Sequence, residues 1–298
     1  MWIQSFVDYL RCERGFSEHT IQGYEADLKE FERFCRGLDD ELTWNNVDAD
    51  VVRQWELSIM ERGSKASSVG RRLSALRAFY RFLMRRGVVE IDPAHLVNAP
   101  KKSKPLPCYM RESEMNRLFD GGFFPGTFEG KRDKAILLTF YSTGIRLSEL
   151  IGLRVSDVDF GQMQLKVTGK RNKQRIVPFG EELKASLDDY LLCRQNALGC
   201  QSVVGDVLFV DERDGSSMSP GRVREVVKQY LSLVTTQSKR SPHVLRHSFA
   251  TAMLNHHADL QSVKELLGHE SLSTTEVYTH ASFEELREVY MHAHPRAL

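Results

Sequence analysis

The second half of this 298-residue chain carries a set of cationic and hydrogen-bonding side chains together with one tyrosine hydroxyl. The six residues are Arg146, Lys170, His243, Arg246, His269 and Tyr278. The sequence has no carboxylate cluster beside them for Mg²⁺ and no G-x-x-x-x-G-K-[ST] loop for a nucleotide. Arginine, histidine and lysine can instead stabilise the charge that builds on the non-bridging oxygens of a pentacoordinate phosphate. The set therefore suits metal-free phosphoryl transfer to a phenol oxygen, and we expect no cofactor.

Gly144 is predicted to end a helix over 135–141, so that Arg146 starts the next helix. Free backbone N–H groups at that helix start make an arginine a reasonable phosphate clamp. Taken alone, Arg146 is more typical of a surface residue paired with Glu149.

Ser241 and Pro242 predict another helix start. His243 and Arg246 are three residues apart on this helix, so both side chains can face the same anion. His243 and His247 are four residues apart, which also allows a zinc pair. The H-E-x-x-H pattern and an obvious third ligand are both missing, so we expect no metal here.

Asp259 is predicted to cap a helix that ends at Gly268 and leaves His269 at its end. The residues expected to be buried on this helix are Leu260, Val263 and Leu267. A single histidine at a helix end is usually structural, so His269 gains meaning only from the rest of the set.

Ser273 and Glu276 predict a capping box that places Tyr278 about one and a half turns into a short helix. A tyrosine in such a helix is by default a core aromatic. Tyr278, like His269, is therefore weak evidence when taken alone.

Residues 163–168 alternate apolar and polar side chains, and residues 175–179 form a second β-like segment after a polar turn. The pattern predicts a β-hairpin. Its tip and flanks carry four cations, which are Lys170, Arg171, Lys173 and Arg175.

The formal net charge of +1 hides a strong asymmetry. Residues 1–50 hold 5 basic and 12 acidic side chains, whereas residues 51–106 hold 12 basic and 4 acidic ones. Eight basic residues and no acid lie between Glu61 and Glu90. Such a face attracts a polyanion, because phosphate contacts release condensed counterions. A solvated basic helix explains the charge alone equally well.

Residues 1–86 are predicted to be helical, with apolar residues at 3/4 spacing in three segments. Ser17 is expected to cap the first segment, Asp48 or Asp50 the second, and Ser67 or Ser68 the third. Residues 87–106 are predicted to be a basic, proline-rich linker. Residues 107–298 are predicted to form a second domain, mainly helical with the one β-hairpin. The expected fold class is thus mainly α, with an α+β second domain.

The chain is typical of a cytoplasmic protein without membrane insertion. No window approaches the roughly 18 uncharged apolar residues of a membrane helix. The N-terminus lacks the basic region and apolar core of a signal peptide. The five cysteines are scattered without a C-x-x-C pair, which indicates reduced thiols.

Three stretches, taken together, are specific. Residues 243–251 read His-Val-Leu-Arg-His-Ser-Phe-Ala-Thr, residues 266–269 read Leu-Leu-Gly-His, and residues 272–280 read Leu-Ser-Thr-Thr-Glu-Val-Tyr-Thr-His. They strongly resemble the tyrosine site-specific recombinases of the phage integrase family, and within it the Xer group. Residues 9–24 and the ending at 294–297 resemble the same group, so the likeness covers nearly the whole chain.

The resemblance implies a two-domain DNA clamp, with a SAM-like core-binding domain, a recombinase catalytic domain and a C-terminal tail that docks on a partner. It implies that double-stranded DNA is cut and rejoined at a specific site through a 3′-phosphotyrosyl intermediate and a Holliday junction. The implied role is the resolution of chromosome dimers at cell division. The implied partners are a paralogous XerD-like recombinase in a tetramer on DNA and an FtsK-like DNA translocase of the division septum.

The resemblance also assigns roles to the six residues. Tyr278 is the nucleophile, Arg146 and Arg246 clamp the scissile phosphate, and His269 hydrogen-bonds a non-bridging oxygen. His243 assists Tyr278 as base or positioner, and Lys170 protonates the leaving 5′-oxygen. The candidate DNA contacts are Lys65, Arg71, Arg72, Arg77, Arg171 and Lys173.

Two positions depart from the family pattern. Arg171 replaces the second glycine of the usual Gly-Lys-Gly hairpin, and Ala252 stands where many Xer proteins have histidine. Three other functions stay open: a phage or transposon integrase, a non-catalytic DNA-binding protein of the same fold, and a type IB topoisomerase. Because the core-binding helices begin at once, we expect an Xer protein rather than a mobile-element integrase.

We predict that Lys170→Ala slows cleavage of ordinary DNA by roughly two to four orders of magnitude, the usual size of general acid catalysis. Activity should recover on a 5′-bridging phosphorothiolate, because sulfur leaves without a proton. Rates of covalent adduct formation on the two substrates test this. If Lys173→Ala is rescued and Lys170→Ala is not, the proton donor is Lys173.

Overall fold

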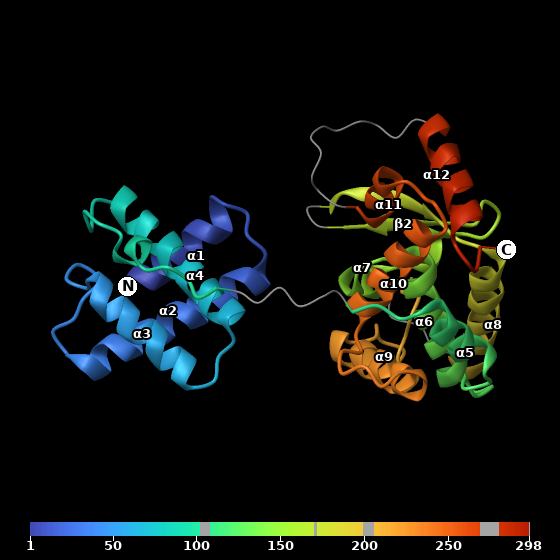
Figure 1. The fold of residues 1–298 in the computed structure, drawn as a ribbon, viewed down its shortest axis with the longest axis horizontal. Helices are drawn as coiled ribbons and strands as arrows, with labels where there is room; N and C mark the ends of the chain where they lie inside the picture. The colour runs from blue at the N-terminus through green and yellow to red at the C-terminus, as the bar shows by residue number, and fades with distance from the viewer. Residues whose placement is uncertain (102–107, 170–171, 199–205, 269–279, 298) are drawn as a thin grey trace. The chain divides into compact units, whose positions relative to one another are not determined.

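The computed structural model describes residues 1–101, 108–169, 172–198, 206–268 and 280–297. The chain divides into two compact units, Met1–Pro105 and Leu106–Leu298, and each has its own hydrophobic core (Figure 1). The described residues are mostly helical with one small sheet, so the predicted fold class is confirmed. Within the described ranges, no helix is both long and apolar enough to cross a lipid bilayer.

The N-terminal unit is a helical bundle built on aromatic contacts. Its elements are α1 (Trp2–Cys12), α2 (Glu18–Leu38), α3 (Ala49–Glu61), α4 (Ala66–Arg85) and the 3₁₀ turn η1 (Pro93–Leu96). Trp55 of α3 meets Phe31 of α2 edge to face, with ring centroids 4.8 Å apart. Phe79 of α4 lies 5.3 Å from Phe6 of α1 in the same geometry. Such edge-to-face pairs add to the gain from burying apolar area.

Two of the three predicted helix starts in this unit are confirmed. The Ser17 hydroxyl accepts from the backbone N–H of Thr20, and the Asp48 carboxylate accepts from two backbone N–H groups at the start of α3. The third prediction is wrong, because Lys65 is the residue before α4 and its side chain makes no cap. Ser67 and Ser68 lie inside the first turn, where the helix has already begun.

The C-terminal unit surrounds one buried helix with helices and a small sheet. Its helices are α5 (Glu112–Asp120), α6 (Phe128–Thr143), α7 (Leu147–Gly152), η2 (Val155–Asp157), α8 (Glu181–Leu198), α9 (Pro220–Val234), α10 (Pro242–Asn255), α11 (Leu260–Leu267) and α12 (His280–Ala293). Every residue of α6 from Ala135 to Thr143 is buried, because α8 and α10 pack against it. The helix starts earlier than the predicted 135–141, at a Thr127 cap.

The sheet confirms the predicted hairpin and adds a short strand to it. Its strands are β1 (Val158–Asp159), β2 (Gln164–Thr168) and β3 (Gln174–Pro178), in the antiparallel order β1-β2-β3. Leu165 pairs with Val177 and Val167 pairs with Arg175, so these four side chains share the buried face.

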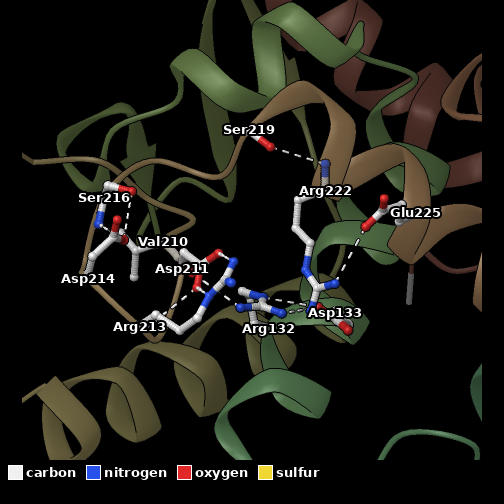
Figure 2. Close-up of polar contacts among 10 residues, drawn as sticks. All are labelled: Arg132, Asp133, Val210, Asp211, Arg213, Asp214, Ser216, Ser219, Arg222 and Glu225. Carbon is white, nitrogen blue, oxygen red and sulfur yellow. Dashed lines mark hydrogen bonds and ion pairs between the residues drawn. The ribbon is translucent and has the colours of Figure 1, made fainter.

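A charged cluster attaches the segment before α9 to α6. The Arg132 guanidinium is 1% exposed and donates to Asp133 at 2.9 and 3.0 Å and to the Val210 carbonyl at 3.4 Å. Asp211 and Arg213 pair beside it at 2.8 Å (Figure 2). Because both charges of the Arg132 pair are desolvated, removing one partner is expected to destabilise this unit strongly.

His294 packs against its own unit just after α12. Its ring stacks on Tyr290, with centroids 5.1 Å apart, and Nε2 lies 3.1 Å from the Tyr141 carbonyl oxygen. Burial lowers the pKa of His294 to about 4. The ring is therefore neutral in the folded protein near neutral pH.

Arg296 attaches the end of the chain to the same unit. It forms an ion pair with Glu182 and another with Asp120 at 2.8 Å. A Cβ at Gly180 would lie 2.2 Å from the Ala297 carbonyl oxygen, so only glycine allows this approach. Docking of the tail on a partner stays a prediction.

We predict that acid destabilises the protein through His294. Unfolded histidine titrates near pH 6.5, so between about pH 6.5 and 4 the unfolded chain binds a proton that the folded chain does not. The free energy of unfolding should fall by up to about 3 kcal/mol as pH decreases through this window. Denaturant unfolding at pH 7 and 4.5 measures it. His294→Phe should lose about one proton of this dependence, and an unchanged slope would contradict the assignment.

Candidate active site

The site begins where Gly144 ends α6. Its φ of +60° is the left-handed conformation that glycine adopts without strain. A Cβ at this position would lie 2.5 Å from the Phe249 ring and 2.8 Å from a Leu267 methyl carbon. The predicted helix break is confirmed, and it turns the chain toward Arg146, which directly precedes α7.

Arg146 is held by one carboxylate and one carbonyl. Its backbone N–H donates to Glu149 Oε2 at 2.7 Å, and Nη1 donates to Glu149 Oε1 at 2.9 Å. Its Nη2 donates to the Gly268 carbonyl at 3.0 Å. Glu149 is only 4% exposed, so the interpretation of this pair as a surface pair is wrong. Arg146 itself keeps 38% of its side chain exposed and is accessible to a ligand.

Arg246 of α10 reaches the same place from the buried side. Its Nη1 donates to the Gly144 carbonyl at 2.6 Å and its Nη2 donates to the Leu267 carbonyl at 2.7 Å. Burial, with the like charge of Arg146, lowers the pKa of Arg246 to about 10. The guanidinium is therefore still charged at neutral pH.

Arg175 of β3 is a third arginine of the site, and the sequence analysis counted it only as a hairpin cation. Nη1 and Nη2 each donate to Glu149 at 2.9 Å, one to each carboxylate oxygen, and Nε donates to the Leu266 carbonyl at 2.9 Å. Strand alternation could have found it. Arg175 and Val177 occupy inward positions, and a charged residue at an inward position predicts a buried partner.

Three arginines therefore converge on three successive carbonyls at the end of α11. Leu266 accepts from Arg175, Leu267 from Arg246, and Gly268 from Arg146. The C-terminal end of a helix favours cations, because its last carbonyls lack partners within the helix. The elements involved, α7, α10, α11 and the sheet, lie together in the C-terminal unit (Figure 1).

Glu149 is the counter-ion of this cluster. Burial alone would raise the pKa of its carboxyl group, but Arg175, helped by Arg146, outweighs burial and lowers the pKa to about 2. The carboxylate is thus ionised at any physiological pH. Three guanidiniums and one carboxylate give the cluster a net charge of +2 that can receive an anion.

The other predicted residues fall in different places. His243 is exposed in the first turn of α10, one turn before Arg246, and Lys173 is exposed beside the hairpin turn. Among the described residues, no three His, Cys, Asp or Glu side chains gather closely enough to hold a metal ion. The predicted residues outside the described ranges are Lys170, Arg171, His269 and Tyr278, together with the Ser273–Glu276 capping box.

The α11 predictions have mixed outcomes. Asp259 accepts from two backbone N–H groups at the helix start, and Gly268 ends the helix with a φ of +65°, as predicted. Val263 and Leu267 are buried. Leu260 is 56% exposed, so its predicted burial is wrong. It is the first residue of the helix, where the apolar stripe has not yet met the core.

In the N-terminal unit, Arg71 and Arg72 are engaged inside the fold. Arg71 forks onto the Asp27 carboxylate, which is 4% exposed, and Arg72 pairs with Glu30 at 3.1 Å. Burial raises the pKa of Asp27 although Arg71 opposes the shift. Half of the Arg71 side chain still faces solvent.

The remaining two candidate contacts of this unit differ from each other. Lys65 is exposed directly before α4. Arg77 donates to the carbonyls of Ala94 and Val97, and it lines a cavity of about 300 Å³ together with Arg81.

Comparison with known proteins places both units. The model of the phage integrase family matches residues 109–285, and the model of the phage integrase N-terminal SAM-like domain matches residues 3–87. The chain is 40% identical over 300 residues to the tyrosine recombinase XerC of Oceanobacillus iheyensis, which covers 100% of this chain and 97% of that protein. It is 37% identical over 299 residues to XerC of Bacillus subtilis, with 99% and 97% coverage.

A solved structure shows the same fold. The XerH site-specific recombinase, crystallised with palindromic difH substrate in a post-cleavage complex, aligns with a TM-score of 0.70 and 21% identity. The alignment covers 91% of this chain and 79% of the XerH chain.

Proposed function

The chain belongs to the phage integrase family and is a XerC-like, site-specific tyrosine recombinase, and on that premise we propose that it resolves chromosome dimers with the arginine cluster as its phosphate site. The observation that carries the assignment of the site is the convergence of Arg146, Arg175 and Arg246 on the end of α11 around one carboxylate. This cluster is cationic, partly open to solvent and already fixed by hydrogen bonds.

In the proposed reaction, Arg146 and Arg246 bind the non-bridging oxygens of the scissile phosphate. A phosphodiester carries one negative charge and the pentacoordinate state carries two, so the net charge of +2 matches the transition state better than the ground state. Because the guanidiniums are already held by Glu149 and the α11 carbonyls, they need little reorganisation as that charge develops.

The remaining roles rest on the sequence. The Tyr278 oxygen attacks phosphorus and forms a 3′-phosphotyrosyl bond while the bond from phosphorus to the 5′-oxygen breaks. His243 takes the tyrosine proton, Lys170 gives a proton to the 5′-oxygen, and His269 donates to a non-bridging oxygen. Attack by a 5′-hydroxyl of the second duplex then forms a Holliday junction, and no ATP is needed.

Relatives named XerC support a chromosomal rather than a mobile-element role. The proposed partners are double-stranded DNA, a paralogous XerD-like recombinase in a tetramer, and an FtsK-like translocase, with the reaction taking place in the cytoplasm. The structure of XerH with its difH substrate supports DNA as the ligand of both units.

We predict that Tyr278→Phe abolishes covalent attachment to DNA and leaves DNA binding largely intact, because only the nucleophilic oxygen is lost. Sheared genomic DNA trapped covalently on the wild-type chain supplies the target sequence, and denaturing gels measure the adduct. An adduct on the Phe variant would show that another residue is the nucleophile. Holliday junctions from two such duplexes distinguish a recombinase from a type IB topoisomerase.

The basic face of α4 should set part of the salt dependence of DNA binding. Lys65→Ala is expected to flatten the slope of log K against log[salt] by about one unit, the value for one lost phosphate contact. Replacing Arg71 and Arg72 with alanine should flatten it by about two units. The double variant should also lower the free energy of unfolding, since Asp27 stays buried without its partners.

Lys29→Ala is the matched control, because this exposed lysine of α2 lies in the acidic stretch and pairs with Glu25. Binding titrations between 50 and 200 mM salt, the range of roughly 10³–10⁵-fold change for many-contact sites, give the slopes. If Lys65→Ala and the double variant keep the wild-type slope, this face is only solvated.

A further inference from the structure

Arg175 has no part in the mechanism above, although it is buried at the centre of the site. Building on the proposed function, we propose that Arg175 is a positioning residue for strand cleavage. Through Glu149 it orients Arg146, and through the Leu266 carbonyl it fixes the end of α11 relative to that arginine.

The hydrogen bonds of Arg175 join two elements that are far apart in the sequence. Its two Nη atoms occupy both oxygens of Glu149, while the same carboxylate accepts from the Arg146 side chain and backbone. Its Nε reaches α11. Arg146 and α11 are therefore fixed relative to each other by one guanidinium as well as by their own contact with Gly268.

Two glycines pack closely on this pair. A Cβ at Gly268 would lie 3.2 Å from Arg175 Nη1, and a Cβ at Gly169 would lie 3.3 Å from Glu149 Oε1 and 3.9 Å from Arg175 Nη1. Gly268 is also left-handed, at φ +65°. Both ends of the described chain that lead to the predicted catalytic residues thus lie against Arg175 or its carboxylate.

Lysine cannot take the place of this arginine. The bidentate contact with Glu149 and the third bond to a carbonyl need the planar, five-donor guanidinium. A lysine ammonium is a single point of charge, which satisfies either the carboxylate or the carbonyl from one position. Arg175→Lys therefore keeps the charge of the cluster and removes its geometry.

Arg132 offers a matched control in the same unit. It is also buried and also binds one carboxylate and one backbone carbonyl, those of Asp133 and Val210 (Figure 2). These are not the partners of Arg146. A purely structural role for Arg175 predicts the same behaviour from Arg175→Lys and Arg132→Lys.

The experiment compares the full-length wild type, Arg175→Lys, Arg175→Met and Arg132→Lys on a nicked suicide duplex of the sequence trapped by the wild type. We expect both Arg175 variants to form the covalent adduct roughly 100-fold more slowly at saturating DNA, the cost of misplacing a reacting group by about 1 Å. Their DNA dissociation constants should stay within about threefold of wild type. Arg132→Lys should keep the wild-type adduct rate on bound DNA.

Two further measurements separate positioning from general damage. Deuterium uptake of the free protein should rise over 260–268 in Arg175→Lys but not in Arg132→Lys. A 5′-bridging phosphorothiolate should leave the Arg175 defect in place, since the defect lies in phosphate binding and not in the proton donor. Recovery on this substrate would overturn the route through Arg146.

The outcomes are distinguishable. An active wild type with an equally active Arg175→Lys overturns the inference alone, as does an equal loss in Arg132→Lys. A wild type that forms no adduct overturns the proposed function, and the inference with it. If Arg175→Met does not fold, Arg175→Lys with unchanged unfolding still decides between the alternatives.

Discussion

Three guanidinium groups that meet at one helix end repel one another, and the carboxylate of Glu149 offsets that repulsion. It accepts hydrogen bonds from Arg146 and Arg175, and its charge also acts on Arg246. The α11 carbonyls supply the rest of the compensation, because a helix C-terminus carries partial negative charge. A cationic site can therefore persist within a folded core before any DNA phosphate arrives.

The architecture of the C-terminal unit follows from bringing these groups together. Each arginine comes from a different element: Arg146 precedes α7, Arg175 lies on β3 and Arg246 lies on α10. Gly144 lets α6 end where Arg246 can reach its carbonyl, and Gly268 leaves room for the Arg175 guanidinium. The two glycines and the buried helix α6 thus serve electrostatics as much as packing.

Sequence reasoning succeeded where structure is set by neighbours along the chain. The caps at Ser17, Asp48 and Asp259, the helix ends at Gly144 and Gly268, and the β-hairpin all follow from local chemistry. It failed at the start of α4 and at Leu260, where the position of the core decides. It did not find the role of Arg175 or the burial of Glu149, because their pairing joins residues 26 positions apart.

The carbonyls of residues 266–268 are also the last part of the cluster to leave the ribosome. Arg146, Arg175 and Arg246 all precede them in synthesis, and until α11 appears Arg246 lacks the Leu267 carbonyl. A chain that stops short of α11 has the cationic side chains without the geometry that aims them. The order of translation therefore leaves an unfinished recombinase unable to assemble its phosphate site, and nascent chains do not threaten the chromosome beside which they are made.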